Sequence, residues 1–173
     1  MDKIDKMNSY TFGELAADFA GGKNKCSASF TVEVTQGMME AFAGLSGDTN
    51  PLHTDETFAV RRGFEGRVAY GMLTASFYSR LVGVYLPGKN CLFQSIEATF
   101  NRPVYAGDVL SVTGRVTEVD ERFRRIKIKA EIRRLAAVSG SEGNAICAAI
   151  SNQQSAIQVR RKLKLDRLAL VSK

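Results

Sequence analysis

The residues best suited to acid–base chemistry are Asp48 and His53, which lie five positions apart. His53 is the only histidine of the chain. A carboxylate paired with a neutral imidazole can hold a water molecule and move its proton near neutral pH. Pro51 fixes its own backbone and drives Asn50 toward an extended conformation, so we expect an irregular loop rather than helical turns between the pair. The spacing therefore predicts a site that activates water.

Metal chemistry and serine hydrolysis fit the sequence less well. The segment 53–55 has the H-x-D spacing of an iron site, but such a site needs a second histidine, which the chain lacks. The three cysteines Cys26, Cys91 and Cys147 do not have the spacing of zinc ligands. Ser79 falls within an expected helix, not at the sharp turn that presents a hydrolase nucleophile. We predict no metal ion and no other cofactor.

The segments around the pair are predicted to be a strand and two helices. Residues 27–34 alternate apolar and polar side chains, as in a half-buried strand. Thr35 can cap a helix that ends at Gly47, and Asp55 or Thr54 can cap a short turn through residues 58–59. The apolar stripe of the first helix consists of Met38, Met39, Phe42 and Leu45. These elements would hold the loop at both ends.

The second half of the chain predicts one buried helix and an antiparallel sheet. Residues 71–86 are apolar nearly all round a helix, which indicates burial on all sides. Strands are expected at 92–100, 108–119, 122–135 and 144–159, separated by turn residues and joined as consecutive hairpins. The helix must then lie across the dry face of the sheet, which gives an α+β fold: a curved antiparallel sheet wrapped around one long central helix.

Length and composition indicate one domain. The chain has 173 residues, of which 45% are hydrophobic and 24% charged, enough to bury a core. We divide it into a lead-in at 1–24, a body at 25–159 and a basic tail at 160–173. The start lacks the apolar core of a signal peptide, and no apolar run reaches the ~18 residues of a membrane span. Together with an odd number of unpaired cysteines, this favours a reduced, cytoplasmic protein without a membrane partner.

The net charge of +6 leaves two kinds of anionic partner open. A basic balance suits nucleic acid or a small anionic substrate. Aromatic residues are not interleaved with the cations as a stacking platform requires, so we predict no nucleic-acid partner. The basic strand face is interpreted as a solvated surface. In the alternative interpretation, some of its cations or of Arg61, Arg62 and Arg67 contact substrate phosphates or an acidic carrier protein. That face consists of Arg125, Lys127, Lys129 and Arg133.

Three motifs resemble the MaoC-like, R-specific enoyl-CoA hydratase family. The first is F-x-x-L-S-G-D-x-N-P-L-H at 42–53, the second is G-R-V-A-Y-G-M-L at 66–73, and the third is R-P-V-Y-A-G-D at 102–108. The resemblance covers about residues 25–158. It implies a hot-dog fold, a homodimer whose two sheets join edge to edge, and a tunnel near the subunit interface. It also implies an acyl thioester of CoA or of a carrier protein as the substrate.

The resemblance assigns roles to individual residues. Asp48 and His53 match the family's catalytic acid–base pair. Gly71 matches the glycine whose backbone N–H polarises the thioester carbonyl, and Ser79 matches a serine that lines the site. Asn50 belongs to the same motif and is assigned to substrate positioning.

The implied reaction adds water to a trans-2-enoyl thioester to give an R-3-hydroxyacyl thioester, or removes water in reverse. Tyr70 is a departure, because many family members have histidine there, and we expect it to alter substrate fit. Two alternatives stay open. One is a hot-dog thioesterase, and the other is a catalytically silent protein that binds acyl thioesters.

Overall fold

The computed structural model describes residues 10–22 and 26–135, and the backbone alone of residues 150–161. The helices are α1 (Phe12–Ala20), α2 (Gln36–Ser46), α3 (Pro51–Thr54), α4 (Glu56–Arg61) and α5 (Gly71–Arg80), and α5 continues into a π-helical turn, η1 (Leu81–Tyr85). The strands are β1 (Ser27–Glu33), β2 (Cys91–Phe100), β3 (Val109–Asp120), β4 (Arg125–Arg134) and β5 (Ile150–Arg161). Arg160 and Arg161 therefore belong to a strand, where we expected the tail to begin. Most of the predicted tail, 162–173, lies outside the described residues.

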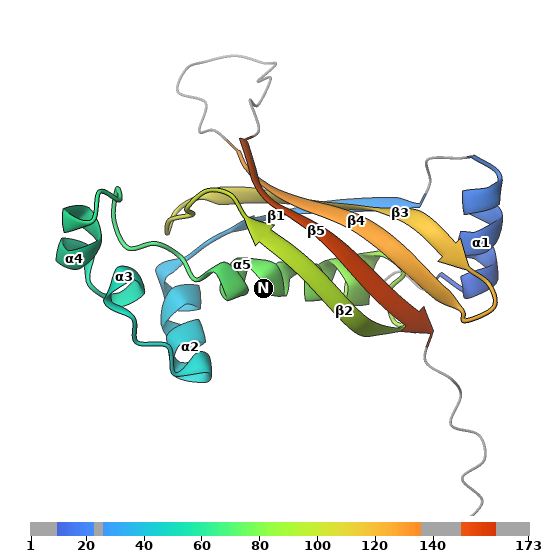
Figure 1. The fold of residues 1–173 in the computed structure, drawn as a ribbon, viewed down its shortest axis with the longest axis horizontal. Helices are drawn as coiled ribbons and strands as arrows, with labels where there is room; N and C mark the ends of the chain where they lie inside the picture. The colour runs from blue at the N-terminus through green and yellow to red at the C-terminus, as the bar shows by residue number, and fades with distance from the viewer. Residues whose placement is uncertain (1–9, 23–25, 136–149, 162–173) are drawn as a thin grey trace, which may run out of the picture.

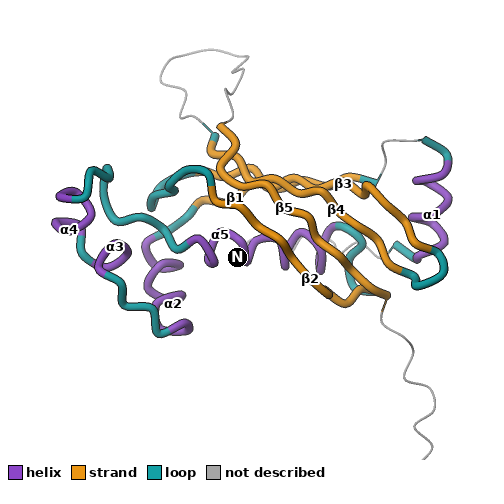
Figure 2. The backbone as a smooth tube through the Cα atoms, in the orientation of Figure 1, coloured by secondary structure: helices purple, strands orange, loops and turns teal. Residues whose placement is uncertain are grey.

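The five strands form one antiparallel sheet, and α5 lies along one of its faces (Figure 1). Helices α2, α3 and α4 gather at one end of α5, and α1 lies at the other end of the molecule (Figure 2). The predicted α+β arrangement of a sheet and a long central helix is confirmed.

The order in which the strands pair in the sheet differs from the predicted consecutive hairpins. The sheet order is β1-β3-β4-β5-β2, so β2 pairs with β5 rather than with β3, the strand that follows it. Consecutive strands joined by turn residues suggest hairpins throughout, but the residues between β2 and β3 cross to the other half of the sheet. Apolar alternation specifies which face of a strand is buried and does not specify its partner.

The core lies between α5 and the inward side chains of β3 and β4. Its fully buried members include Tyr78, Leu81, Leu110, Val112, Ile128 and Ile132. Gly114 on β3 allows the helix to approach closely, because a Cβ there would come within 2.6 Å of Leu81 Cδ2. The outward side chains of the same strands are charged. Lys127 pairs with Glu118, and Arg133 pairs with Glu131, as expected for a solvated face.

The predicted ends of α2 and α4 are confirmed. The Thr35 hydroxyl accepts the Met38 N–H at the start of α2, which ends at Gly47. The Asp55 carboxylate accepts the Phe58 N–H at the start of α4.

The expectation that no helical turn lies between Asp48 and His53 is wrong. Pro51 begins the short helix α3, and the Asn50 side chain caps it by accepting the Leu52 N–H. At the first position of a helix, proline lacks only an N–H that has no helical partner, and its fixed backbone angle suits the helix. His53 therefore sits on a helical turn, and the irregular part of the segment is 47–50.

Helix α5 is buried on one side rather than all round. Met72 is 61% exposed, and Ser76, Ser79 and Arg80 are also exposed. These four positions follow helical spacing and form one stripe along α5. Leu45, which we expected in the apolar stripe of α2, is 85% exposed. No helix in the described part of the chain is long and apolar enough to cross a membrane.

Candidate active site

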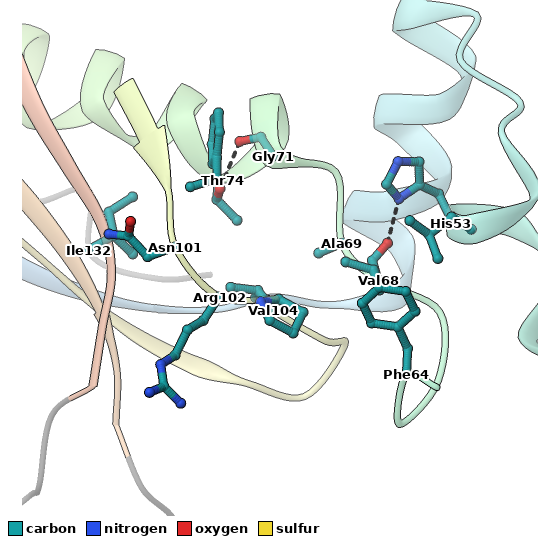
Figure 3. A pocket seen from close by; sticks show the side chains of 13 residues that line it. His53, Phe64, Val68, Ala69, Gly71, Thr74, Asn101, Arg102, Val104 and Ile132 are labelled. Carbon is teal, nitrogen blue, oxygen red and sulfur yellow. Dashed lines mark hydrogen bonds between the residues drawn. The ribbon is translucent and has the colours of Figure 1, made fainter. Parts of the chain in front are cut away.

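A cavity of about 340 Å³ lies between the start of α5, the segment before it and the chain that leaves β2 (Figure 3). His53 and Gly71 both line it, and so do apolar side chains from each of these segments. The remaining lining residues are Leu52, Phe64, Val68, Ala69, Thr74, Phe100, Asn101, Arg102, Pro103, Val104 and Ile132. The cavity brings one predicted acid–base residue and the predicted oxyanion donor into the same space.

The imidazole of His53 is oriented by the backbone of Val68. Its Nδ1 lies 2.7 Å from the Val68 carbonyl oxygen (Figure 3). A carbonyl oxygen can only accept a hydrogen bond, so Nδ1 carries the proton in the neutral ring. Nε2 then keeps its lone pair and is available as a base. The contact fixes both the orientation and the tautomer of His53.

Backbone hydrogen bonds hold the segment that carries this carbonyl. The Val68 N–H donates to the Leu52 carbonyl over 3.1 Å, and the Ala69 N–H donates to the Val104 carbonyl over 2.7 Å. Val68 also forms an isolated antiparallel bridge with Tyr105. The His53 side chain and the backbone of its own helix are thus both attached to one well-anchored segment.

Asp48 lies in the exposed segment between α2 and α3. Its carboxylate accepts the Asn50 N–H over 3.0 Å, and its backbone carbonyl accepts the Tyr70 hydroxyl over 2.9 Å. Asn50 also accepts the His53 N–H on its own carbonyl. Neither Asp48 nor Asn50 is among the described residues that line the cavity. Asn50 instead links the two members of the pair through the backbone.

Tyr70 is buried behind the cavity wall, with 2% of its surface exposed. Its ring centroid lies 4.1 Å from that of His53 and 5.1 Å from that of Phe42. Burial raises the pKa of the phenol, and the Asp48 charge raises it further. Ala69 and Gly71, on either side of Tyr70, line the cavity, but Tyr70 itself does not. It contacts the Asp48 backbone and the His53 ring, the two residues predicted as the acid–base pair, whereas the sequence led us to expect an effect on substrate fit.

Gly71 is the first residue of α5 and faces the aromatic ring of Phe100. A Cβ at Gly71 would lie 3.1 Å from that ring, so a side chain there would crowd the cavity. The first N–H groups of a helix have no partner within it, and they carry the positive end of the helix dipole. The Thr74 hydroxyl donates to the Gly71 carbonyl over 2.7 Å. The cavity therefore has an electropositive backbone end opposite His53.

Ser79 is not brought to the cavity. It lies eight residues after Gly71, about 12 Å further along the helix axis, and its side chain is exposed. The predicted site residues thus separate into three groups. His53 and Gly71 line the cavity, Asp48 and Asn50 lie outside it in the segment that leads into α3, and Ser79 lies on the outer stripe of α5.

Several lining residues were not predicted as site residues. Thr74 lies one turn after Gly71, and the i, i+3 spacing of these two residues was sufficient to find it. Arg102 belongs to the third motif and is exposed at the cavity, with its side chain directed away from His53 in Figure 3. Phe64 comes from the loop after α4 and Ile132 from the predicted strand β4, and only the tertiary fold brings them to the cavity.

Within the described residues, no three His, Cys, Asp or Glu side chains cluster so that they could hold a metal ion. The thiols of Cys26 and Cys91 are free and lie against the backbone carbonyls of Leu15 and Val82. Burial raises the pKa of both thiols, which disfavours the reactive thiolate. Among the described residues that line the cavity, His53 and the backbone N–H groups at the start of α5 are suited to proton transfer and to binding negative charge.

Comparison with known proteins finds one family and several hydratases. Residues 20–137 match the family model described as MaoC like domain. The chain is 40% identical over 91 residues to an (R)-specific enoyl-CoA hydratase of Rhodospirillum rubrum, a match that covers 53% of this chain and 63% of that enzyme. It is 30% identical over 138 residues to a 3-hydroxybutyryl-CoA dehydratase of Methylorubrum extorquens, covering 80% of this chain and 81% of that one.

A solved structure is similar over nearly all of its length. The (R)-hydratase of Aeromonas caviae, which is involved in PHA biosynthesis, superposes with a TM-score of 0.68 at 28% identity. The superposition covers 79% of this chain and 94% of that one. The curved sheet around a central helix is thus shared with hydratases of the hot-dog fold.

Proposed function

The chain belongs to the MaoC-like domain family, and we propose that it adds water to trans-2-enoyl thioesters to form R-3-hydroxyacyl thioesters, and catalyses the reverse dehydration. The observation that carries the proposal is the cavity lined both by His53, whose Nδ1 is held by the Val68 carbonyl, and by Gly71 at the N-terminus of α5. An acid–base group and an oxyanion donor in one apolar cavity suit the addition of water to a double bond that is conjugated with a carbonyl.

His53 acts as the base in this proposal. Its Nε2 accepts one proton of a bound water molecule while the water oxygen bonds to C3 of the substrate. A proton is returned to C2 from the same side, so the water supplies both the hydroxyl group and the new C2 hydrogen. Asp48 holds the water with His53, and Asn50 holds the loop that carries both residues.

Negative charge develops on the thioester oxygen during the addition. The Gly71 N–H at the start of α5 is the proposed donor to that oxygen. One preorganised donor of this kind contributes about 3 kcal/mol to stabilisation of the transition state. Because the donor is a backbone group at the end of a packed helix, it needs little reorganisation during the reaction.

The acyl group would lie among the apolar lining residues. The anionic CoA or carrier-protein part of the substrate would extend out of the cavity beside Arg102. CoA and an acyl-carrier protein both present phosphate, and an exposed guanidinium suits either. Ser79 keeps its assignment to substrate positioning only if the substrate also contacts the outer stripe of α5.

We also propose that the chain forms a homodimer through β2. A bulge between Phe93 and Ser95 shifts the alternation of β2 by one residue. After it, Ile96 and Phe100 continue the face on which Cys91 and Phe93 pack against the core. Ile96 and Phe100 are nevertheless 38% and 47% exposed, because β2 is an edge strand that α5 does not fully cover. A second copy would cover this apolar edge.

The test is hydration of crotonyl-CoA and longer enoyl-CoAs by the purified protein, with chiral analysis of the product. Loss of enoyl absorbance with formation of the R-3-hydroxyacyl thioester is expected. Release of free CoA thiol without hydration would favour a thioesterase. Tight binding without either reaction would favour a silent thioester-binding protein.

A further inference from the structure

One buried side chain, that of Tyr70, joins the three groups assigned to catalysis. It contacts the His53 ring, donates to the Asp48 carbonyl and directly precedes Gly71 in the chain. We propose that Tyr70 is a positioning residue, which holds Asp48 and His53 in fixed places relative to the N–H of Gly71. The inference rests on the hydratase function proposed above.

The hydroxyl of Tyr70 anchors the loop that carries Asp48. This loop is exposed, and helix α2 ends just before it, at Gly47. The 2.9 Å bond from the Tyr70 hydroxyl fixes the backbone at the residue that carries the carboxylate. The other bonds of Asp48, to Asn50 and to Ser46 at the end of α2, reach only two residues along the chain and cannot fix its distance from α5. Tyr70 supplies that long-range connection.

The aromatic ring of Tyr70 packs against the imidazole ring of His53. The two rings are tilted by 33° with centroids 4.1 Å apart, and Phe42 of α2 packs against the Tyr70 ring at 5.1 Å. The Val68 carbonyl fixes the imidazole through Nδ1. A hydrogen bond at one atom leaves the ring free to rotate about that contact, and the packed aromatic ring removes this freedom. Together they fix the direction of the Nε2 lone pair.

The backbone of Tyr70 directs its side chain away from the substrate. Tyr70 is the residue that precedes the first turn of α5, with an extended backbone, and its side chain makes no capping bond to that helix. Its neighbours Ala69 and Gly71 border the cavity while the Tyr70 side chain points into the protein. Loss of the hydroxyl should therefore change the rate of the chemical step and leave substrate binding intact.

The hydrogen bond from the Tyr70 hydroxyl to the Asp48 carbonyl persists at alkaline pH. Burial and then the Asp48 charge raise the pKa of the Tyr70 phenol above its ordinary value of 10.0, while Arg67 opposes the shift. The phenol stays protonated and continues to donate over the pH range in which a hydratase is assayed.

The experiment compares Tyr70→Phe with Tyr85→Phe in the crotonyl-CoA hydration assay. The first variant keeps the ring against His53 and loses only the bond to Asp48. The second loses a comparable hydroxyl contact, to Arg80, at the far end of the central helix. We expect Tyr70→Phe to lower kcat about tenfold with KM changed less than about twofold, and Tyr85→Phe to change neither. Equal kcat values for Tyr70→Phe and the wild type would overturn the inference.

A double variant separates positioning from a general loss of structure. In an Asp48→Asn background there is no carboxylate left to position, so adding Tyr70→Phe should lower the residual kcat by less than about twofold. A further tenfold loss in that background would mean that Tyr70 does not act through Asp48, and would overturn the inference.

If the wild type hydrates no thioester, the proposed function fails and the role of Tyr70 fails with it. That result is distinct from an active wild type with an equally active Tyr70→Phe variant.

Discussion

The orientation of His53 is the most informative feature at the scale of single residues. Spacing along the chain predicted His53 and Asp48 as partners, but it did not reveal that the Val68 carbonyl sets the tautomer or that Tyr70 packs on the ring. Val68 and Tyr70 lie 15 and 17 residues further along the chain. Their contacts with His53 depend on where the segment before α5 folds back, which no local pattern encodes.

The tautomer can be measured without substrate. Because His53 is the only histidine, its imidazole nitrogens give a single set of signals in a long-range ¹H–¹⁵N NMR spectrum of labelled protein. For the neutral ring we expect a protonated Nδ1 and an unprotonated Nε2, since the Val68 oxygen can only accept. The opposite assignment, with the proton on Nε2, would contradict the role of His53 as a base toward the cavity.

At the scale of elements, the four-residue helix α3 is what places His53. It is too short to be stable alone, so its cap and its neighbours hold it. The Asn50 side chain accepts the Leu52 N–H, and the Asn50 backbone connects to both Asp48 and His53. The cap of α3 therefore affects the geometry of the site as well as its stability.

Replacement of Asn50 by alanine tests this role. We expect the free energy of unfolding in urea to fall by about 1 kcal/mol through loss of the cap. We also expect kcat to fall by about tenfold or more, because small displacements of a catalytic group are costly. Asn50→Ser, which keeps a capping side chain, should recover most of both losses.

Thr35→Ala is the matched control for this prediction. It removes the cap of α2, at the end of that helix far from Asp48, and should lower stability by a similar amount of about 1 kcal/mol. Its kcat should stay at the wild-type level. A fall in kcat as large as that of Asn50→Ala would mean that the effect reflects stability alone.

The sequence predicted individual elements better than their assembly. Capping residues and periodicity located α2, α4, α5 and the strands, since these signals are local. Pro51 was interpreted as excluding helical turns, yet it begins α3, because the same residue is a breaker inside a helix and favourable at its first turn. The partner of β2 and the exposed stripe of α5 depend on distant segments, and so does the separation of Ser79 from the cavity.

At the scale of the whole molecule, apolar side chains remain exposed along the edge formed by β2 and α5. Met72 on α5 is 61% exposed, and Ile96 on β2 is 38% exposed. The sequence predicted that the helix containing Met72 is buried on all sides. An apolar pattern has the same form whether the protein itself or a second copy covers it.

Replacement of Ile96 by aspartate tests the proposed dimer. The wild type should sediment with twice the 18.9 kDa mass of the chain, and Ile96→Asp should shift it toward the monomer, because an unpaired charge in an apolar interface is costly. Phe123→Asp is the control, since Phe123 is 46% exposed in the turn between β3 and β4, away from this edge. A monomeric wild type, or an Ile96→Asp variant that stays dimeric, would contradict the interface.

The most direct measurement is the rate at which the wild type, Asp48→Asn and His53→Ala consume the enoyl absorbance of crotonyl-CoA. We predict rapid hydration by the wild type and a fall of at least about a hundredfold in kcat for each variant, because both members of the pair handle the reacting water. The variants should keep the wild-type circular dichroism spectrum, since Asp48 is exposed and His53 is only half-buried. Wild-type rates in either folded variant would contradict the assignment of Asp48 and His53 as the pair that activates water.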